Sequence, residues 1–128
     1  MNNNFKYRIT KVLDKIKKDG IIWKKERLKN KHLRRRREKQ HLNSDASMED
    51  YEKVILELIN EKNNDVFLYY KYEDDYFIFG NRKTNWIAIF SEEAIIDTAF
   101  IIDEVEYDEY LSLKDKYLPL GKLSDFIE

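Results

Sequence analysis

The sequence predicts an α+β domain in which N-terminal helices pack on a roughly four-stranded antiparallel β-meander. Before residue 60, apolar residues recur at helical spacing, and from Val66 they gather in short aromatic and β-branched segments separated by turns. Helices followed by strands are the order typical of α+β domains. The length of 128 residues suits a single domain. Within it we distinguish a basic helical part, 1–45, and an acidic part of helix plus sheet, 46–128.

Two helices and a short strand are predicted in the first forty residues. One helix covers about 5–18, and Gly20 is suited to end it. The apolar segment 21–23 suits a brief strand. The segment 26–40 is helix-forming but poor in apolar residues, so this helix needs a partner surface or a ligand. The apolar face of the first helix consists of Phe5, Ile9, Val12, Leu13 and Ile16.

A third helix is predicted to begin near Ser47. Ser47 and Asp50 have the spacing of a capping box, which satisfies backbone N–H groups at a helix start. The polar segment 63–65 is expected to end this helix. Its core-facing stripe consists of Tyr51, Val54, Ile55, Leu58 and Ile59.

Four strands joined by short turns are predicted next, and together they form the meander. Beyond Asp103 the chain is acidic and aromatic, and we expect a short helix plus coil there. The predicted strands are 66–72, 76–79, 86–90 and 95–102, with turns over 73–75, 80–85 and 91–94.

The formal net charge of −1 conceals two oppositely charged parts. Residues 1–45 hold ten lysines and six arginines against five acids, a balance of +11. Residues 46–128 hold seven lysines and one arginine against twenty acids, a balance of −12. This asymmetry favours a polyanion as partner of the basic part. The alternative is that the two parts neutralise each other within the fold.

Several kinds of site and location are not expected. The chain has no cysteine, which excludes disulfides and thiolate metal sites. It shows no His-Glu-x-x-His spacing and no glycine-rich phosphate loop, so we expect neither a metal nor another cofactor. It also has no apolar run typical of a signal peptide or a membrane span. We therefore expect a cytoplasmic protein without a membrane partner.

The segment from His32 to His41 has the strongest chemical signal. It holds the only two histidines of the chain, and between them lie the arginines 34–37 and Lys39. Arginine binds phosphate through paired hydrogen bonds, and histidine exchanges protons near neutral pH. Metal-free cleavage of RNA requires a phosphate held beside proton carriers. The alternative is a solvated basic helix whose histidines have no chemical role.

The order of these features resembles the barnase–EndoU–colicin–RelE group of small ribonucleases, especially its phage and polymorphic-toxin branch. The resemblance spans about residues 21–102. Its elements are the apolar patch 21–23, the histidine-bearing basic helix, the helix with Tyr51, and the meander. The last strand carries a Thr-Ala-aromatic motif, here Ile96-Asp97-Thr98-Ala99-Phe100.

The resemblance implies a metal-independent endoribonuclease of toxin type. His32 or His41 would be the catalytic histidine, and Thr98 would supply a late-strand hydroxyl. Arg27, or an arginine from 34–37, would contact the phosphate. Such an enzyme needs a base for the 2′-hydroxyl, an acid for the leaving 5′-oxygen, and cations for the transition state. The expected partners are RNA, with tRNA as one candidate, and a cognate antitoxin or immunity protein.

Other residues are candidates for contacts with RNA. Candidate phosphate ligands are the cations between the histidines and two cations in a predicted turn. They are Arg34, Arg35, Arg36, Arg37 and Lys39, together with Arg82 and Lys83. Tyr70 and Tyr72 are candidates for stacking on bases, as sheet aromatics do in RNA-binding folds. Core packing is the alternative for the tyrosines, and simple solvation for the turn cations.

Two other classes of function remain open. A non-catalytic nucleic-acid-binding regulator or antitoxin-like module would use the basic helix on phosphates. A protein-interaction module would use the acidic part as a mimic of nucleic acid. Convergence of His32 or His41 with Thr98 and arginines in one concave site would favour the enzyme.

Overall fold

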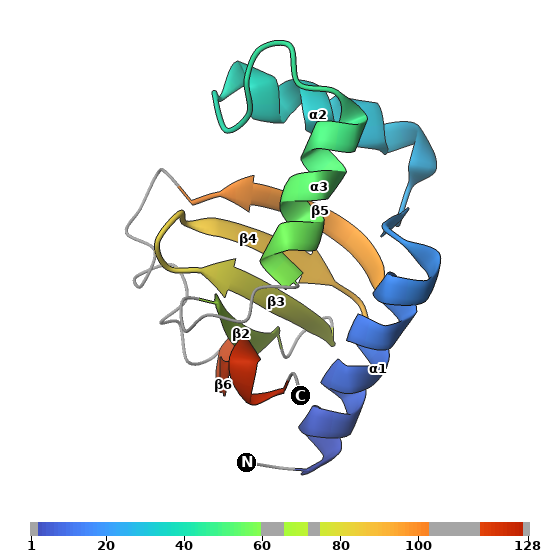
Figure 1. The fold of residues 1–128 in the computed structure, drawn as a ribbon, viewed down its shortest axis with the longest axis vertical. Helices are drawn as coiled ribbons and strands as arrows, with labels where there is room; N and C mark the ends of the chain where they lie inside the picture. The colour runs from blue at the N-terminus through green and yellow to red at the C-terminus, as the bar shows by residue number, and fades with distance from the viewer. Residues whose placement is uncertain (1–2, 60–65, 72–74, 103–115, 127–128) are drawn as a thin grey trace.

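The computed structural model describes residues 3–59, 66–71, 75–102 and 116–126 (Figure 1). In this part of the chain, N-terminal helices pack on a mixed sheet whose strand order is β1-β5-β4-β3-β2-β6. The predicted α+β class is thus confirmed. The elements are α1 (Asn3–Asp19), β1 (Ile22–Trp23), the 3-10 turn η1 (Glu26–Leu28), α2 (Lys29–Glu38), α3 (Met48–Ile59), β2 (Val66–Lys71), β3 (Tyr76–Asn81), β4 (Trp86–Phe90), β5 (Ile95–Ile101), β6 (Tyr117–Lys122) and the 3-10 turn η2 (Leu123–Asp125).

The prediction of a four-stranded antiparallel sheet was wrong in two respects. The meander β2–β5 is present, but β1 adds to it in parallel beside β5, and β6 adds to it in antiparallel orientation beside β2. The brief strand predicted over 21–23 is present as β1, but it is too short to show a period that would predict its place in the sheet. β6 lies where we expected a short helix plus coil, and it contains Pro119 and Gly121, residues that are uncommon in strands. They are tolerated because β6 is an edge strand whose register shifts beside them.

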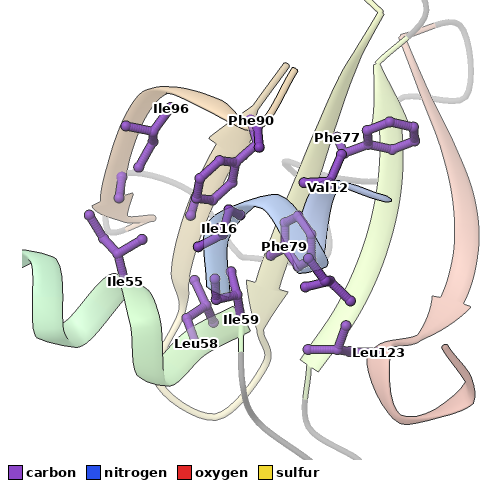
Figure 2. Close-up of a cluster of buried hydrophobic side chains, with 14 of the residues drawn as sticks. Val12, Ile16, Ile55, Leu58, Ile59, Phe77, Phe79, Phe90, Ile96 and Leu123 are labelled. Atoms are coloured by element: carbon purple, nitrogen blue, oxygen red, sulfur yellow. The ribbon is translucent and has the colours of Figure 1, made fainter. Parts of the chain in front are cut away.

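The main core lies between the sheet and the helices α1 and α3 (Figure 2). In Figure 1, α3 crosses the face of the sheet, α1 runs along one side, and α2 lies beyond β5. The apolar stripes predicted for both helices supply this core. Burial of their large side chains contributes about 1.5–3 kcal/mol each. The cluster includes Val12 and Ile16 of α1, Ile55, Leu58 and Ile59 of α3, and Phe77, Phe79 and Phe90 of the sheet.

The predicted capping box at the start of α3 is confirmed. The backbone N–H of Ser47 donates to Asp50 Oδ2 at 2.9 Å, and that of Asp50 donates to Ser47 Oγ at 3.1 Å. Hydrogen bonds from Ser47 lower the pKa of Asp50, so its carboxylate stays ionised in this cap. The helix that carries Tyr51 therefore begins at a defined residue. None of the described helices has both the length and the apolar composition needed to cross a bilayer.

The edge of β5 is closed partly by side chains. β1 pairs only with Ile95 and Ile96. Further along, the buried Tyr51 hydroxyl donates to the Ala99 carbonyl at 2.5 Å, and the Ile101 N–H donates to His41 Nδ1 at 3.2 Å. An open strand edge invites pairing with other chains, and buried backbone groups need partners. These two contacts therefore bring α3 and the turn after α2 against the edge of β5.

We expect Tyr51→Phe to lower the free energy of unfolding by about 1–3 kcal/mol, because the buried Ala99 carbonyl loses its donor. Burial raises the pKa of Tyr51 to about 12, so the hydroxyl is a constant donor at ordinary pH. Urea unfolding followed by fluorescence measures the change. The control is Tyr7→Phe, because the Tyr7 side chain is 64% exposed. Equal stabilities of the two variants would contradict this role of Tyr51.

Candidate active site

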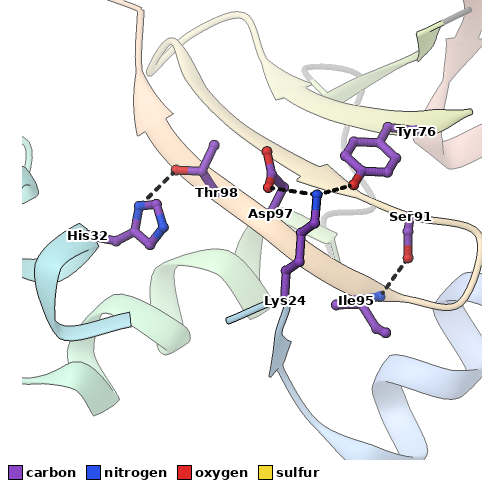
Figure 3. Close-up of polar contacts among 7 residues, drawn as sticks. All are labelled: Lys24, His32, Tyr76, Ser91, Ile95, Asp97 and Thr98. Atoms are coloured by element: carbon purple, nitrogen blue, oxygen red, sulfur yellow. Dashed lines mark hydrogen bonds and ion pairs between the residues drawn. The ribbon is translucent and has the colours of Figure 1, made fainter. Parts of the chain in front are cut away.

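α2 and β5 bring His32 and Thr98 together. Their Nδ1 and Oγ1 atoms lie 3.5 Å apart, the long end of hydrogen-bond distance (Figure 3). His32 faces β5 because α2 lies against that strand. Two of the residues that the sequence analysis assigned to one site, 66 positions apart, are thus neighbours in the fold.

The imidazole of His32 is held against a fixed aromatic wall. The rings of Trp23 and His32 stack with centroids 5.7 Å apart and an interplanar angle of 20°. Trp23 is buried, and its Nε1 donates to Glu52 Oε2 at 2.7 Å. Trp23 also packs on Tyr51, with ring centroids 5.4 Å apart. β1 and α3 together therefore restrict the orientation of the histidine ring.

A hollow of about 190 Å³ lies beside His32. It is lined by Lys24, Lys25, Leu28, His32 and Asp97. The backbone N–H of Lys24 donates to the Ile96 carbonyl at 2.9 Å, which attaches this segment to β5. The hollow therefore combines an imidazole, two ammonium groups and a carboxylate.

A β-bulge in β5 shapes one wall of the hollow. Ile89 pairs with Thr98, but its neighbour Phe90 pairs with Ile96, so Asp97 is the extra residue. Bulges redirect side chains and are frequent beside active sites. In Figure 3, Asp97 and Thr98 lie next to each other, between His32 and Lys24.

Lys24 connects the hollow to a tyrosine on β3. Its Nζ donates to the Tyr76 hydroxyl at 2.8 Å and lies 3.9 Å from Asp97 Oδ1 (Figure 3). The ammonium is also 5.4 Å from the centroid of the Tyr76 ring. Three parts of the chain, the residue after β1 together with β3 and β5, thus contribute polar groups to one place.

The surroundings of His32 lower its pKa below the ordinary value of an imidazole. Burial is the largest cause, and the positive charges of Arg36, Arg35 and Lys31 act in the same direction. The carboxylate of Asp97 opposes them. His32 is therefore neutral at neutral pH, which is the form that accepts a proton.

His41 has a different position from His32. Its Nδ1 accepts hydrogen bonds from the Ile101 N–H at 3.2 Å and from Arg36 Nη1 at 3.1 Å. Two donors at Nδ1 require that this nitrogen carry no proton. The ring lies edge-on to Trp86, with centroids 6.0 Å apart. His41 thus binds the edge of β5, and it does not line the hollow beside His32.

The four arginines of the basic run divide into two pairs. Arg34 and Arg35 are exposed. Arg36 is only 6% exposed, and its guanidinium carbon lies 5.4 Å from the centroid of the Phe100 ring. Arg37 Nε donates to the Ala46 carbonyl at 2.7 Å. The second pair holds α2 and the turn after it in place, while the first pair is open to solvent.

The remaining candidate cations lie outside the hollow, or their side chains are not described. Arg27 belongs to η1, and its side chain is outside the described part of the structure. Lys39 is exposed at the end of α2. The turn between β3 and β4 carries the exposed Lys83 and also Arg82, whose guanidinium lies 5.2 Å from the centroid of the Phe67 ring. This turn is at the end of the strands opposite Asp97.

Tyr70 is part of the packing under α1. Its ring centroid lies 5.2 Å from that of Phe5 and 5.5 Å from that of Phe77, and its hydroxyl donates to Asp75. The structure does not bring it to the hollow. Tyr72 lies outside the described residues.

Several groups in and around the hollow were not predicted from the sequence: Lys24, Lys25 and Asp97 line it, Trp23 stacks on His32, and Tyr76 accepts from Lys24. Lys24 and Lys25 directly follow the apolar patch, and Asp97 precedes Thr98 in the closing strand, so both positions carried a weak signal. Tyr76 carried none, because its place depends on the register of β3, β4 and β5. Within the described ranges, no three His, Asp or Glu residues are grouped to hold a metal ion.

The chain belongs to the family described as uncharacterised protein aq_aa01, whose model matches residues 6–117. No curated protein and no solved structure gives a significant match. The description of the family names no activity, so the function has to be argued from the site.

Removal of a negative charge and removal of a positive charge beside His32 should shift its pKa in opposite directions. Asp97→Asn removes a negative charge that stabilises the imidazolium, so the pKa of His32 falls further. Arg35→Gln removes a positive charge, so this pKa rises. NMR titration of the His32 ring in the wild type and in each variant measures both shifts. A shift in the same direction in both variants would contradict the described surroundings of His32.

Proposed function

We propose that this protein is a metal-independent endoribonuclease in which His32 carries the proton of the 2′-hydroxyl. One observation supports this most directly. His32 Nδ1 lies 3.5 Å from Thr98 Oγ1 at the wall of a hollow that also holds Lys24 and Lys25. A proton carrier and cations in one concave place are the groups that this cleavage requires.

The two ring nitrogens of His32 have separate roles in this proposal. Nδ1–H donates to Thr98 Oγ1, which leaves the lone pair of Nε2 to accept a proton. The stacked Trp23, itself held by Glu52, keeps the ring in this orientation. The lowered pKa of His32 keeps the ring neutral before the reaction.

The cations beside His32 complete the chemistry. Attack of the 2′-oxygen places additional negative charge on the phosphoryl oxygens, and the ammonium groups of Lys24 and Lys25 stabilise it. The exposed Arg34 and Arg35 of α2 attract more distant phosphates. The toxin assignment, with tRNA as a candidate substrate and a cognate antitoxin or immunity protein in the cytoplasm, rests on the resemblance in element order.

A non-catalytic nucleic-acid-binding module is the second candidate function. The observation that favours it is the solvent-facing pair Arg34 and Arg35, which can bind phosphate whether or not cleavage occurs. Intact RNA together with salt-dependent binding would identify this function.

Purified protein is expected to cleave RNA in EDTA, to leave 2′,3′-cyclic phosphate ends, and to leave DNA intact. Replacement of the proton carrier by His32→Gln should lower the rate by about 10²–10⁴-fold. The control is Lys53→Gln, which removes an exposed cation of α3 that does not line the hollow. Mass spectrometry of the RNA ends and the cleavage rates provide the measurement. Undigested RNA at all protein concentrations, or equal rates for wild type and His32→Gln, would refute the proposal.

Binding of RNA should depend on the exposed arginines of α2, Arg34 and Arg35. We expect Arg34→Gln with Arg35→Gln to weaken binding of a 2′-O-methyl RNA, which cannot be cleaved. For a single strand, the slope of log K against log salt should become shallower by about 0.7 for each phosphate that the double variant no longer neutralises. Fluorescence anisotropy across a salt series measures both effects, with Lys53→Gln on α3 as a control for net charge. An unchanged slope would show that α2 does not bind the RNA.

A further inference from the structure

The two groups that contact the His32 ring are both in contact with Tyr51 of α3. Trp23 stacks on the imidazole, with ring centroids 5.7 Å apart, and the Tyr51 ring lies 5.4 Å from that of Trp23. Thr98 Oγ1 lies 3.5 Å from His32 Nδ1, and Thr98 also forms a side-chain hydrogen bond with the Tyr51 hydroxyl. Tyr51 is fully buried. One core residue therefore supports the imidazole through an aromatic wall and through a hydroxyl.

We propose that Tyr51 is a positioning residue that sets the tautomer of His32 through Thr98, an inference that rests on the proposed ribonuclease function. The direction of each hydrogen bond follows from what the groups can donate. A backbone carbonyl only accepts, so the hydrogen of the Tyr51 hydroxyl goes to the Ala99 carbonyl, 2.5 Å away. The Tyr51 oxygen can then only accept from Thr98, and this uses the single hydrogen of the Thr98 hydroxyl.

The Thr98 oxygen is left with only a lone pair to present to His32. A lone pair at this place requires a hydrogen on Nδ1, so the neutral ring carries its hydrogen there and keeps the lone pair of Nε2. A free neutral histidine prefers the opposite tautomer, with the hydrogen on Nε2. The hydrogen bonds that start at the Ala99 carbonyl therefore select the tautomer in which Nε2 is the base.

The same hydrogen bonds favour the protonated ring. When Nε2 takes up a proton the ring becomes a cation, and a hydrogen bond from a charged donor is about twice as strong as one between neutral groups. Thr98 thus stabilises the protonated ring more than the neutral ring. Tyr51 keeps the Thr98 hydroxyl turned in the direction that allows this, because its own hydrogen is held by the backbone of β5.

Two-bond ¹H–¹⁵N NMR spectra of the His32 ring, recorded where the ring is neutral, measure the tautomer directly. Wild type should show a protonated Nδ1 and an unprotonated Nε2. In Tyr51→Phe the Thr98 hydroxyl loses its acceptor and can donate to Nδ1, so we expect a shift toward the Nε2–H tautomer and a loss of about tenfold or more in the cleavage rate. The control Tyr7→Phe, at a tyrosine that is 64% exposed, should change neither.

Variants of Thr98 test the same hydrogen bonds from the other end. Thr98→Val removes the hydroxyl from a side chain of similar shape, and it should shift the tautomer as Tyr51→Phe does. Thr98→Ser retains the hydroxyl and should retain the wild-type tautomer. A hydrogen on Nε2 in wild type, or an unchanged tautomer in Tyr51→Phe, would overturn the positioning role. If Tyr51→Phe does not fold, the tautomer in Thr98→Val decides in the same way.

The tautomer does not depend on catalysis, so it separates this inference from the proposed function. If the tautomer depends on Tyr51 as described but wild type leaves RNA intact, the positioning role is upheld and the ribonuclease proposal is wrong. If cleavage depends on His32 while Tyr51→Phe keeps both the tautomer and the rate of wild type, the ribonuclease proposal is upheld and the positioning role is wrong.

Discussion

The need to close the edge of β5 is the constraint on which the arrangement of α2 depends. β1 pairs with only the first two residues of that strand, so the outward backbone groups at Ala99 and Ile101 need other partners. Tyr51 and His41 supply them. The contact through His41 requires α2 to run alongside β5, and this same position brings His32 to Thr98. The same packing of α2 against β5 therefore closes the sheet edge and assembles the candidate site.

The arginines of α2 have two different roles, and the sequence alone does not show which arginine has which role. Arg36 is four residues after His32, so both lie on the inner face of α2. There Arg36 contacts His41 and Phe100, and its charge contributes to the lowered pKa of His32. Arg34 and Arg35 are exposed to solvent. The positive balance of the first 45 residues thus includes cations that stabilise the fold as well as cations open to a polyanion.

The sequence predicted those parts of the fold that depend on local patterns. The apolar stripes of α1 and α3 and the strands of the meander follow from side-chain period, and the cap at Ser47 follows from local spacing. β6 was missed because Pro119 argues against a strand unless its edge position is known. The choice between the histidines was open because α2 ends at Glu38, and Gln40 has a φ of 62°, so helical spacing no longer applies at His41. The grouping of Lys24, Tyr76 and Asp97 depends on strand register and on the bulge, which only the tertiary structure determines.

Both side chains that close the edge of β5 bind backbone atoms, the Ala99 carbonyl and the Ile101 N–H. A carbonyl is present at every position and an N–H at every position except proline, so this closure makes few demands on the side chains of β5. The side chains of Ala99 and Ile101 themselves take no part in these two hydrogen bonds. Tyr51 and His41 have no such freedom, because few other side chains reach and pair with those atoms. Within the family, Tyr51 and His41 are therefore expected to be retained even where the residues at positions 99 and 101 are replaced.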